Sequence, residues 1–157
     1  MLDFRARVAQ FLPQASSGAL SCFETCAGLA STDLQSNAPY AFPKPYGFNI
    51  VSILTADFGI SLIRIDPGQS TSLHFHSLRY EAFFVRSGRL TLAKGPEKIL
   101  ILAGSISGSK PHEPHRLSNV AGEPLEIIEL FAPPLLDDTT RVEDRYNRVL
   151  GCVRRGQ

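Results

Sequence analysis

Three residues that can bind a metal ion lie within one ten-residue stretch, SLHFHSLRYE, which runs from Ser72 to Glu81. His74 and His76 are separated by a single residue, and Glu81 follows five residues after the second histidine. In a strand, alternate side chains point to the same face, so both histidines would project together with Cα atoms about 7 Å apart. A tight turn through residues 77–80 would then bring the Glu81 carboxylate beside His76.

A third histidine, His115, opens a later apolar run in which Leu117 and Asn119 would share its face. Three imidazoles and one carboxylate can therefore converge on one point inside a barrel. Burial of such groups is costly unless they are paired or bind a cation. Neutral imidazole suits Fe, Ni, Zn or Cu, and a carboxylate adds Mn, while open coordination positions would allow catalysis. We predict one divalent metal ion (Fe, Mn, Zn, Co or Ni), with the ligands His74, His76, Glu81 and His115.

The elements that would position these ligands are short strands. Between residues 48 and 132, runs rich in Ile, Val, Leu, Phe and Thr are separated by turn residues such as Gly and Pro. The runs are FNIVSILTA, GISLIRI, TSLHFH, YEAFFVR, RLTLA, KILILA, HRLSN and LEIIELFA. Regular short strands with such turns predict an all-β sandwich or barrel. No helix-length periodic run separates them, which argues against a parallel sheet of βαβ units.

The residues before the first strand have a different pattern. Apolar side chains at helical spacing in the first dozen residues predict a short amphipathic helix, which Pro13 ends. A second short helix is expected over residues 21–29. The proline-rich stretch APYAFPKPYG, residues 38–47, predicts an extended arm.

The last segment, residues 137–150, is charged and compatible with a helix. We expect it to cap the barrel, with Tyr146 packed and the charges exposed. The chain would then consist of an N-terminal helical segment and arm (residues 1–43), a barrel (44–136), and a C-terminal cap and tail (137–157).

The composition excludes several functional classes. The formal net charge is +1 and no basic cluster occurs, which argues against nucleic-acid binding. No apolar run reaches the roughly 20 residues of a membrane helix, and the charged N-terminus does not resemble a signal peptide, so we expect a cytoplasmic location. Three cysteines do not form a disulfide framework. We interpret Cys22 and Cys26, four residues apart, as small apolar fillers.

Two segments resemble the conserved motifs of the cupin superfamily. The stretch GQSTSLHFHSLRYEAFFVRSG fits the first cupin motif at every spacing, and PHEPHRLSN resembles the second. The matching residues are Gly68, His74, His76, Glu81, Gly88, Pro111, His115 and Asn119. The chain departs from the second motif at His112, where cupins usually carry a glycine. The resemblance implies a cupin double-stranded β-helix, a jelly-roll barrel, with short N-terminal helices and a C-terminal helical cap.

The ends of this region point to a subfamily. The element KPYG before the first strand and the stretch DDTTRVEDRYNR after the last are similar to those of the cupin domain of type II mannose-6-phosphate isomerases. This resemblance covers residues 44–148. The chain departs from that family at His74, where a glutamine is often found, and at Ser77-Leu78, where a histidine-rich string is common.

The resemblance implies an isomerase of a phosphorylated hexose in which the metal acts as a Lewis acid. The sequence does not identify the base that moves the proton. Phosphate recognition requires fixed cations, and His112 can also reach toward the pocket. The candidate substrate-binding residues are Arg79, Arg64, Lys44, Arg141, Arg145 and His112.

Two other functions remain open on the same residues. The complete set of three histidines and one glutamate is also that of mononuclear non-haem iron cupin dioxygenases, for which Phe83, Phe84 and Phe131 would supply an apolar pocket. A non-catalytic cupin that binds a sugar or metabolite is the third candidate function.

Small cupins commonly dimerise, so we expect a homodimer in which the N-terminal arm adds to a neighbour's sheet edge.

Overall fold

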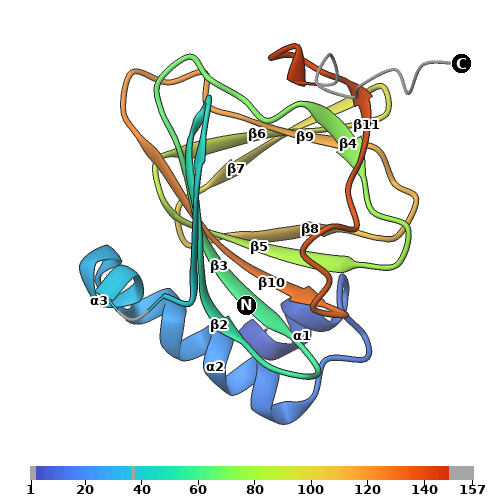
Figure 1. Ribbon diagram of the computed structural model, residues 1–157. Coiled ribbons are helices and arrows are strands. Elements are labelled where there is room, and N and C mark those ends of the chain that lie inside the picture. The colour runs from blue at the N-terminus through green and yellow to red at the C-terminus, as the bar shows by residue number, and fades with distance from the viewer. Residues whose placement is uncertain (1–2, 37, 149–157) are drawn as a thin grey trace, which may run out of the picture.

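The described residues of this computed structural model, 3–36 and 38–148, form two antiparallel sheets that face each other across a barrel (Figure 1). The first sheet has the strand order β1 (Tyr40–Lys44), β2 (Gly47–Leu54), β3 (Gly59–Ile65), β10 (Leu125–Ala132), β5 (Tyr80–Ser87) and β8 (Ile106–Ser109). The second has the order β11 (Thr140–Glu143), β4 (Leu73–Phe75), β9 (His115–Ser118), β6 (Arg89–Lys94) and β7 (Glu97–Leu102). Each of the eight predicted runs contains a strand, which confirms the predicted all-β barrel.

The central strands β3 and β10 of the six-stranded sheet are buried on both faces, because their two sets of alternating side chains meet different partners. On β3, Ser61 and Ile63 line the barrel interior, whereas Ile60 and Leu62 pack in a separate cluster with residues of the N-terminal helices. The strands β3 and β10 pair in register, so their alternations match across the sheet. This explains why the sequences of both strands are nearly continuously apolar.

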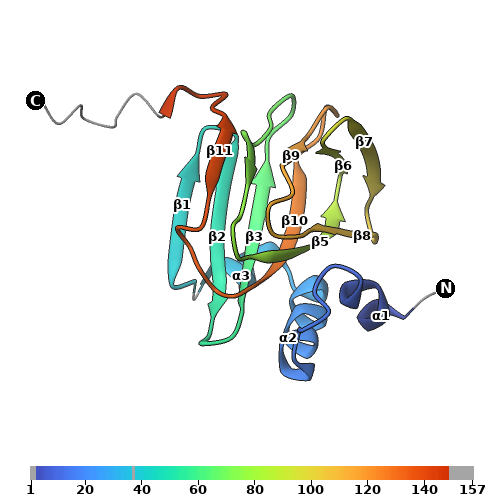
Figure 2. The ribbon, with the colours of Figure 1, turned by 90° about the vertical axis from the view of Figure 1, so that its right-hand side faces the viewer.

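Three short helices precede the barrel: α1 (Phe4–Ala9), α2 (Ser17–Gly28) and α3 (Ser31–Ser36). Both views place α1 and α2 against the six-stranded sheet, on the side remote from the last described residues (Figure 2). The Ser16 side chain accepts a hydrogen bond from the Ala19 N–H (3.1 Å), and this N-cap starts α2 four residues before the predicted position. Cys22 and Cys26 are free and pack in this helical layer.

Two strands besides β1 were not predicted from the sequence, and one of them corrects an expectation. The segment that contains β8 is short and polar, and Gly108 in it has no room for a side chain. A Cβ there would lie 2.2 Å from the Glu81 carbonyl oxygen and 2.5 Å from the Phe11 ring. The predicted C-terminal helical cap is wrong over the described residues, because residues 140–143 form β11. This strand pairs with the edge of β4, which supplies the hydrogen-bond partners that the isolated segment lacks.

The proline-rich stretch is extended, as predicted, and it forms β1 by pairing antiparallel with β2 of the same chain. Because β1 ends the six-stranded sheet in this single chain, its outer edge is open to a strand from a second copy. Among the described residues, no helix is long and apolar enough to cross a membrane.

Candidate metal centre in the barrel

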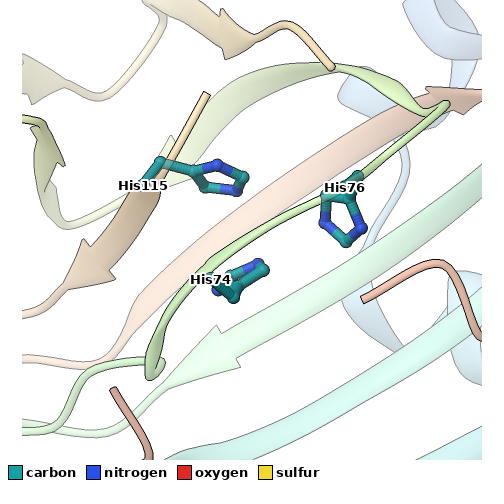
Figure 3. A group of neighbouring side chains, drawn as sticks. All are labelled: His74, His76 and His115. Carbon is teal, nitrogen blue, oxygen red and sulfur yellow. The ribbon is translucent and has the colours of Figure 1, made fainter. Parts of the chain in front are cut away.

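The three histidines converge from two adjacent strands (Figure 3). His74 on β4 lies directly across from His115 on β9, and His76 follows β4 immediately. Each histidine offers one ring nitrogen to a common point, and these three atoms lie within 4.8 Å of one another. The strand alternation that the sequence predicted for His74 and His76 is therefore confirmed, and the tertiary fold adds His115.

A backbone carbonyl orients each imidazole. The Nδ1 atom of His74 lies 2.8 Å from the Ser72 carbonyl oxygen, and that of His115 lies 2.9 Å from the Glu113 carbonyl oxygen. The Nδ1 atom of His76 contacts the carbonyl oxygen of Asp138. A carbonyl can only accept a hydrogen bond, so each ring carries its proton on Nδ1. The Nε2 lone pairs are thus left to face the common point, as in metal-binding histidines.

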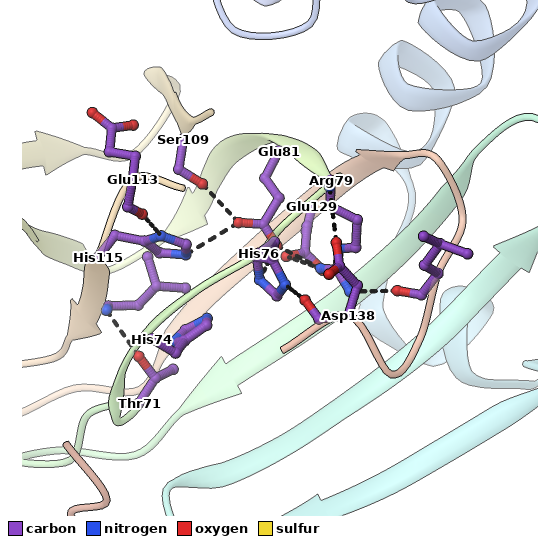
Figure 4. Close-up of polar contacts among 12 residues, drawn as sticks. Thr71, His74, His76, Arg79, Glu81, Ser109, Glu113, His115, Glu129 and Asp138 are labelled. Carbon is purple, nitrogen blue, oxygen red and sulfur yellow. Dashed lines mark hydrogen bonds and ion pairs between the residues drawn. The ribbon is translucent and has the colours of Figure 1, made fainter. Parts of the chain in front are cut away.

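The Glu81 carboxylate lies beside this cluster, next to His76 and His115 (Figure 4). One carboxylate oxygen, Oε1, lies 2.9 Å from Nε2 of His76, and the other, Oε2, lies 3.1 Å from Nε2 of His115. The contact with His76 lacks hydrogen-bond alignment, and this Nε2 is buried with no hydrogen-bond partner. Lone pairs of nitrogen and oxygen that face each other at such distances need a cation between them, either a proton or a metal ion.

The electrostatic surroundings keep His74 neutral. Burial lowers the pKa of His74 most, the neighbouring His115 lowers it further, and Glu81 opposes the shift, so the pKa falls to about 3. A neutral imidazole is the form that binds a metal ion, because protonation removes the lone pair. Three oriented imidazoles with a carboxylate beside them match the ligand preferences of Zn, Fe, Mn, Co and Ni. The residues therefore fit a divalent transition metal.

The carboxylate of Glu81 has other partners as well. Arg79 Nη2 donates to Oε1, and Ser109 Oγ donates to Oε2 at 2.7 Å. Burial alone would raise the pKa of Glu81, but the Arg79 charge and the two histidine contacts hold this pKa well below its usual value. Glu81 is thus an ionised group that neutralises Arg79 and lies next to the three histidines.

Residues 61–131 match the family described as "Cupin domain". The barrel is a cupin domain. Across 107 residues, 67% of this chain, the sequence is 34% identical to the xanthan biosynthesis protein XanB of Xanthomonas campestris pv. campestris. The match spans 23% of that protein's length, less than a quarter of it.

Solved structures share the fold of this cupin. An uncharacterized protein with a double-stranded β-helix domain from Klebsiella pneumoniae has a TM-score of 0.59 and 22% identity, over 74% of this chain and 98% of its own. A putative sugar phosphate isomerase from Acidithiobacillus ferrooxidans has a TM-score of 0.52 and 24% identity, over 69% of this chain and 76% of its own. At these identities the likeness shows a common architecture.

The cavity of the cupin barrel holds some of the predicted substrate-binding residues and not others. Lys44, Arg79 and Arg141 line it together with the histidines. Arg64 does not line it and pairs with Asp66 at 3.2 Å on the surface. Arg145 does not line it either, and its guanidinium lies 6.0 Å from the Tyr146 ring centroid.

Arg79 is committed to the protein itself. Its guanidinium contacts Glu81, lies 3.4 Å from Glu129, donates to the Leu135 carbonyl at 3.1 Å, and stacks over the Phe131 ring. Burial, followed by the charge of Glu81, raises the pKa of Glu129 to about 8. Arg79 is thus a buried cation that contacts two carboxyl groups beside the histidine cluster, and the phosphate-binding role predicted for it finds no support in these contacts.

His112 lies at the surface and does not line the cavity. Its backbone has a φ of 61°, a left-handed conformation that glycine adopts without strain. This conformation explains why the corresponding position of the second cupin motif usually carries glycine. The His112 N–H donates to the His76 carbonyl at 2.7 Å, so the position contributes through its backbone.

Two site residues from the C-terminal segment were missed by sequence reasoning. Asp138 accepts hydrogen bonds from the backbone N–H groups of Ser77, Leu78 and Arg79 at 2.8–3.0 Å, which fixes the turn between His76 and Glu81. Arg148 lines the cavity and donates to Ser72 Oγ at 2.8 Å. Both lie in the acidic and basic stretch DDTTRVEDRYNR, where charge alone does not distinguish a buried contact from a solvated one.

Proposed function

We propose that this cupin is a metal-dependent isomerase of a phosphorylated hexose of the mannose 6-phosphate type. The observation that carries the proposal is one cavity that is lined both by the histidine cluster and by cations. His74, His76 and His115 line it, and so do Lys44, Arg141 and Arg148. The motif resemblance to type II mannose-6-phosphate isomerases supports the same reaction. A homologue named mannose-1-phosphate guanylyltransferase, from Klebsiella pneumoniae, is 26% identical over 107 residues.

The three cations that line the cavity suit a substrate that carries phosphate. Burial lowers the pKa of Lys44, and the positive charges of Arg148 and Arg141 lower it further, which indicates that the three side chains lie near one another. Arg148 also pairs with Asp144 at 3.3 Å, and this contact helps to hold its guanidinium in place beside the cavity. Such a group of cations would be relieved of its mutual repulsion by a bound dianion.

The histidine cluster would supply the chemical step. A divalent metal bound by His74, His76 and His115, with Glu81 as a fourth ligand, supplies a Lewis acid for a substrate carbonyl or hydroxyl oxygen. The carbonyl groups of Ser72, Glu113 and Asp138 hold the three imidazoles in the ligating tautomer. Phe83 and Phe131 line the cavity next to them and exclude water from part of it. We also propose that the enzyme acts in the cytoplasm as a homodimer.

The test is an isomerase assay. Protein stripped of metal and reloaded separately with Mn²⁺, Fe²⁺, Co²⁺ or Zn²⁺ should interconvert mannose 6-phosphate and fructose 6-phosphate, and His74→Ala should abolish the reaction. Lys44→Met should raise KM for the sugar phosphate while the metal content stays unchanged. Failure to interconvert these sugars with every metal contradicts the proposal. Oxygen consumption by the Fe²⁺-loaded protein with an organic substrate would favour the dioxygenase instead.

A further inference from the structure

The cavity wall formed by β2, β3 and β10 carries polar side chains where a packed barrel interior would be apolar. Asn49 on β2, Ser61 on β3 and Glu129 on β10 all line the cavity. Ser61 lies directly across from Glu129 in the β3–β10 register. These strands belong to the six-stranded sheet, whereas His74 and His115 belong to the facing sheet. The polar wall and the histidine cluster therefore border one cavity from two sheets.

Two polar atoms of this wall are buried without a partner. The Ser61 hydroxyl and the Asn49 side-chain oxygen have no hydrogen-bond partner, and Ser61 is only 1% exposed. A buried polar atom without a partner destabilises a protein, so each such atom calls for a ligand, a water or another role. Apolar side chains of similar size would pack there at no such cost. The retained polar atoms indicate that the wall is built for hydrogen bonding with something in the cavity.

The chemistry of the wall favours hydroxyl groups over charged groups. A serine hydroxyl donates and accepts, an amide oxygen accepts, and a carboxyl group beside them adds further hydrogen-bonding capacity. A polyol presents neighbouring hydroxyls that both donate and accept, so it can satisfy all three. Val51 and Ile63 line the cavity beside these groups and suit the C–H faces of a sugar. The cations Lys44, Arg141 and Arg148, which also line the cavity, would bind an anionic group of the same molecule.

We propose that Asn49, Ser61 and Glu129 form a hydroxyl-binding subsite that orients the polyol chain of the substrate against the histidine cluster. The inference rests on the proposed function for the phosphate group of the ligand. The subsite itself recognises hydroxyl groups and does not require a phosphate. These three residues would distinguish a sugar phosphate from other small phosphate esters. Ser61 and Asn49 are specificity-determining residues in this assignment.

The test is calorimetric binding of three probes to the metal-loaded full chain. The probes are mannose 6-phosphate, inorganic phosphate and the unphosphorylated polyol mannitol. Ser61→Ala and Asn49→Leu should each weaken mannose 6-phosphate binding about five- to tenfold, the effect of one neutral hydrogen bond, and leave inorganic phosphate binding unchanged. The matched control is Ser52→Ala. Its hydroxyl is also buried without a partner, but Ser52 does not line the cavity. This control should change neither affinity.

Stability separates binding from misfolding. Because the Ser61 hydroxyl has no partner in the protein, Ser61→Ala should not lower the Tm of the ligand-free protein. If the wild type binds mannose 6-phosphate and both cavity variants bind it equally well, the subsite is overturned while the proposed function stands. If mannitol binds in a Ser61-dependent way but the phosphate adds no affinity and no isomerisation occurs, the subsite stands and the proposed function fails. Absence of binding of both mannose 6-phosphate and mannitol to the wild type overturns the subsite.

Discussion

His76 is oriented by the backbone carbonyl of Asp138, a residue 62 positions further along the chain. The carboxylate of the same aspartate accepts hydrogen bonds from three consecutive N–H groups of residues 77–79. Asp138 therefore acts on the site twice, since it orients one candidate ligand and fixes the turn that leads to Glu81.

Replacement of the Asp138 carboxylate should loosen this turn. We expect Asp138→Ala to lower the free energy of unfolding by about 1–2 kcal/mol, as loss of a helix-capping carboxylate does. Metal affinity should fall about tenfold, because without the carboxylate anchor the Asp138 backbone carbonyl is held less firmly against His76 Nδ1. Denaturant unfolding and metal titration measure the two effects. Asp137→Ala, at the exposed neighbouring position, is the control, and equal behaviour of the two variants would contradict the role of Asp138.

The histidine cluster should bind metal only when complete. His74→Ala should reduce metal affinity by more than the roughly 10–100-fold that loss of an outer-shell partner costs. His112→Ala should leave the metal content unchanged, because this side chain does not line the cavity. Elemental analysis of protein purified without chelators gives both results. A metal content that is the same in wild type and His74→Ala would remove this histidine from the ligand set.

Arg79 should matter for stability. Arg79→Met leaves the ionised Glu81 carboxylate buried without its cation, and we expect a loss of about 3–5 kcal/mol in the free energy of unfolding. Arg64→Met removes an exposed ion pair with Asp66 and should cost no more than about 1 kcal/mol. Equilibrium unfolding in urea compares the two. A variant Arg79→Met that is as stable as Arg64→Met would mean that Arg79 is not a structural cation.

The buried carboxyl of Glu129 should make stability depend on pH. Its pKa is raised to about 8 in the folded state, against about 4.3 in an unfolded chain. Between these values the folded protein holds a proton on Glu129 that the unfolded chain has lost, so the contribution of Glu129 to stability should fall as the pH rises from about 5 to about 8. His74, whose pKa is lowered to about 3, has the opposite effect up to about pH 6.5, so the net decline should be clearest between about pH 6.5 and 8. In metal-free protein, Glu129→Gln should flatten this decline in Tm. Glu126→Gln, on the same strand but outside the cavity, should retain it.

The homodimer remains a prediction that solution mass can test. The outer edge of β1 ends the six-stranded sheet, and the exposed Tyr40 lies on this strand. Pairing of two such edges would satisfy backbone groups that otherwise face water. Light scattering should give twice the mass of one chain, and a monomer across the working concentration range would refute the dimer.

The sequence alone determined eight of the eleven β-strands and the spacing of the histidine pair. Alternation in a strand depends only on local geometry, so His74 and His76 had to share a face once residues 73–75 were extended. The turn that returns Glu81 to His76 spans only residues 77–80, although the distant Asp138 carboxylate fixes it. The strand pattern predicted an all-β sandwich or barrel, and the resemblance of two segments to the cupin motifs specified the cupin barrel.

Only the tertiary structure decided what the charged residues do. Arg79 and Arg64 are equally plausible phosphate ligands in the sequence, yet one is buried between two carboxyl groups and the other is at the surface. The charged C-terminal segment is compatible with a helix, but it forms β11 because the edge of β4 offers hydrogen-bond partners. The roles of Asp138, Arg148 and Ser61 likewise depend on neighbours more than 50 residues away. Long-range pairing and burial set these roles, and neither is encoded in local spacing.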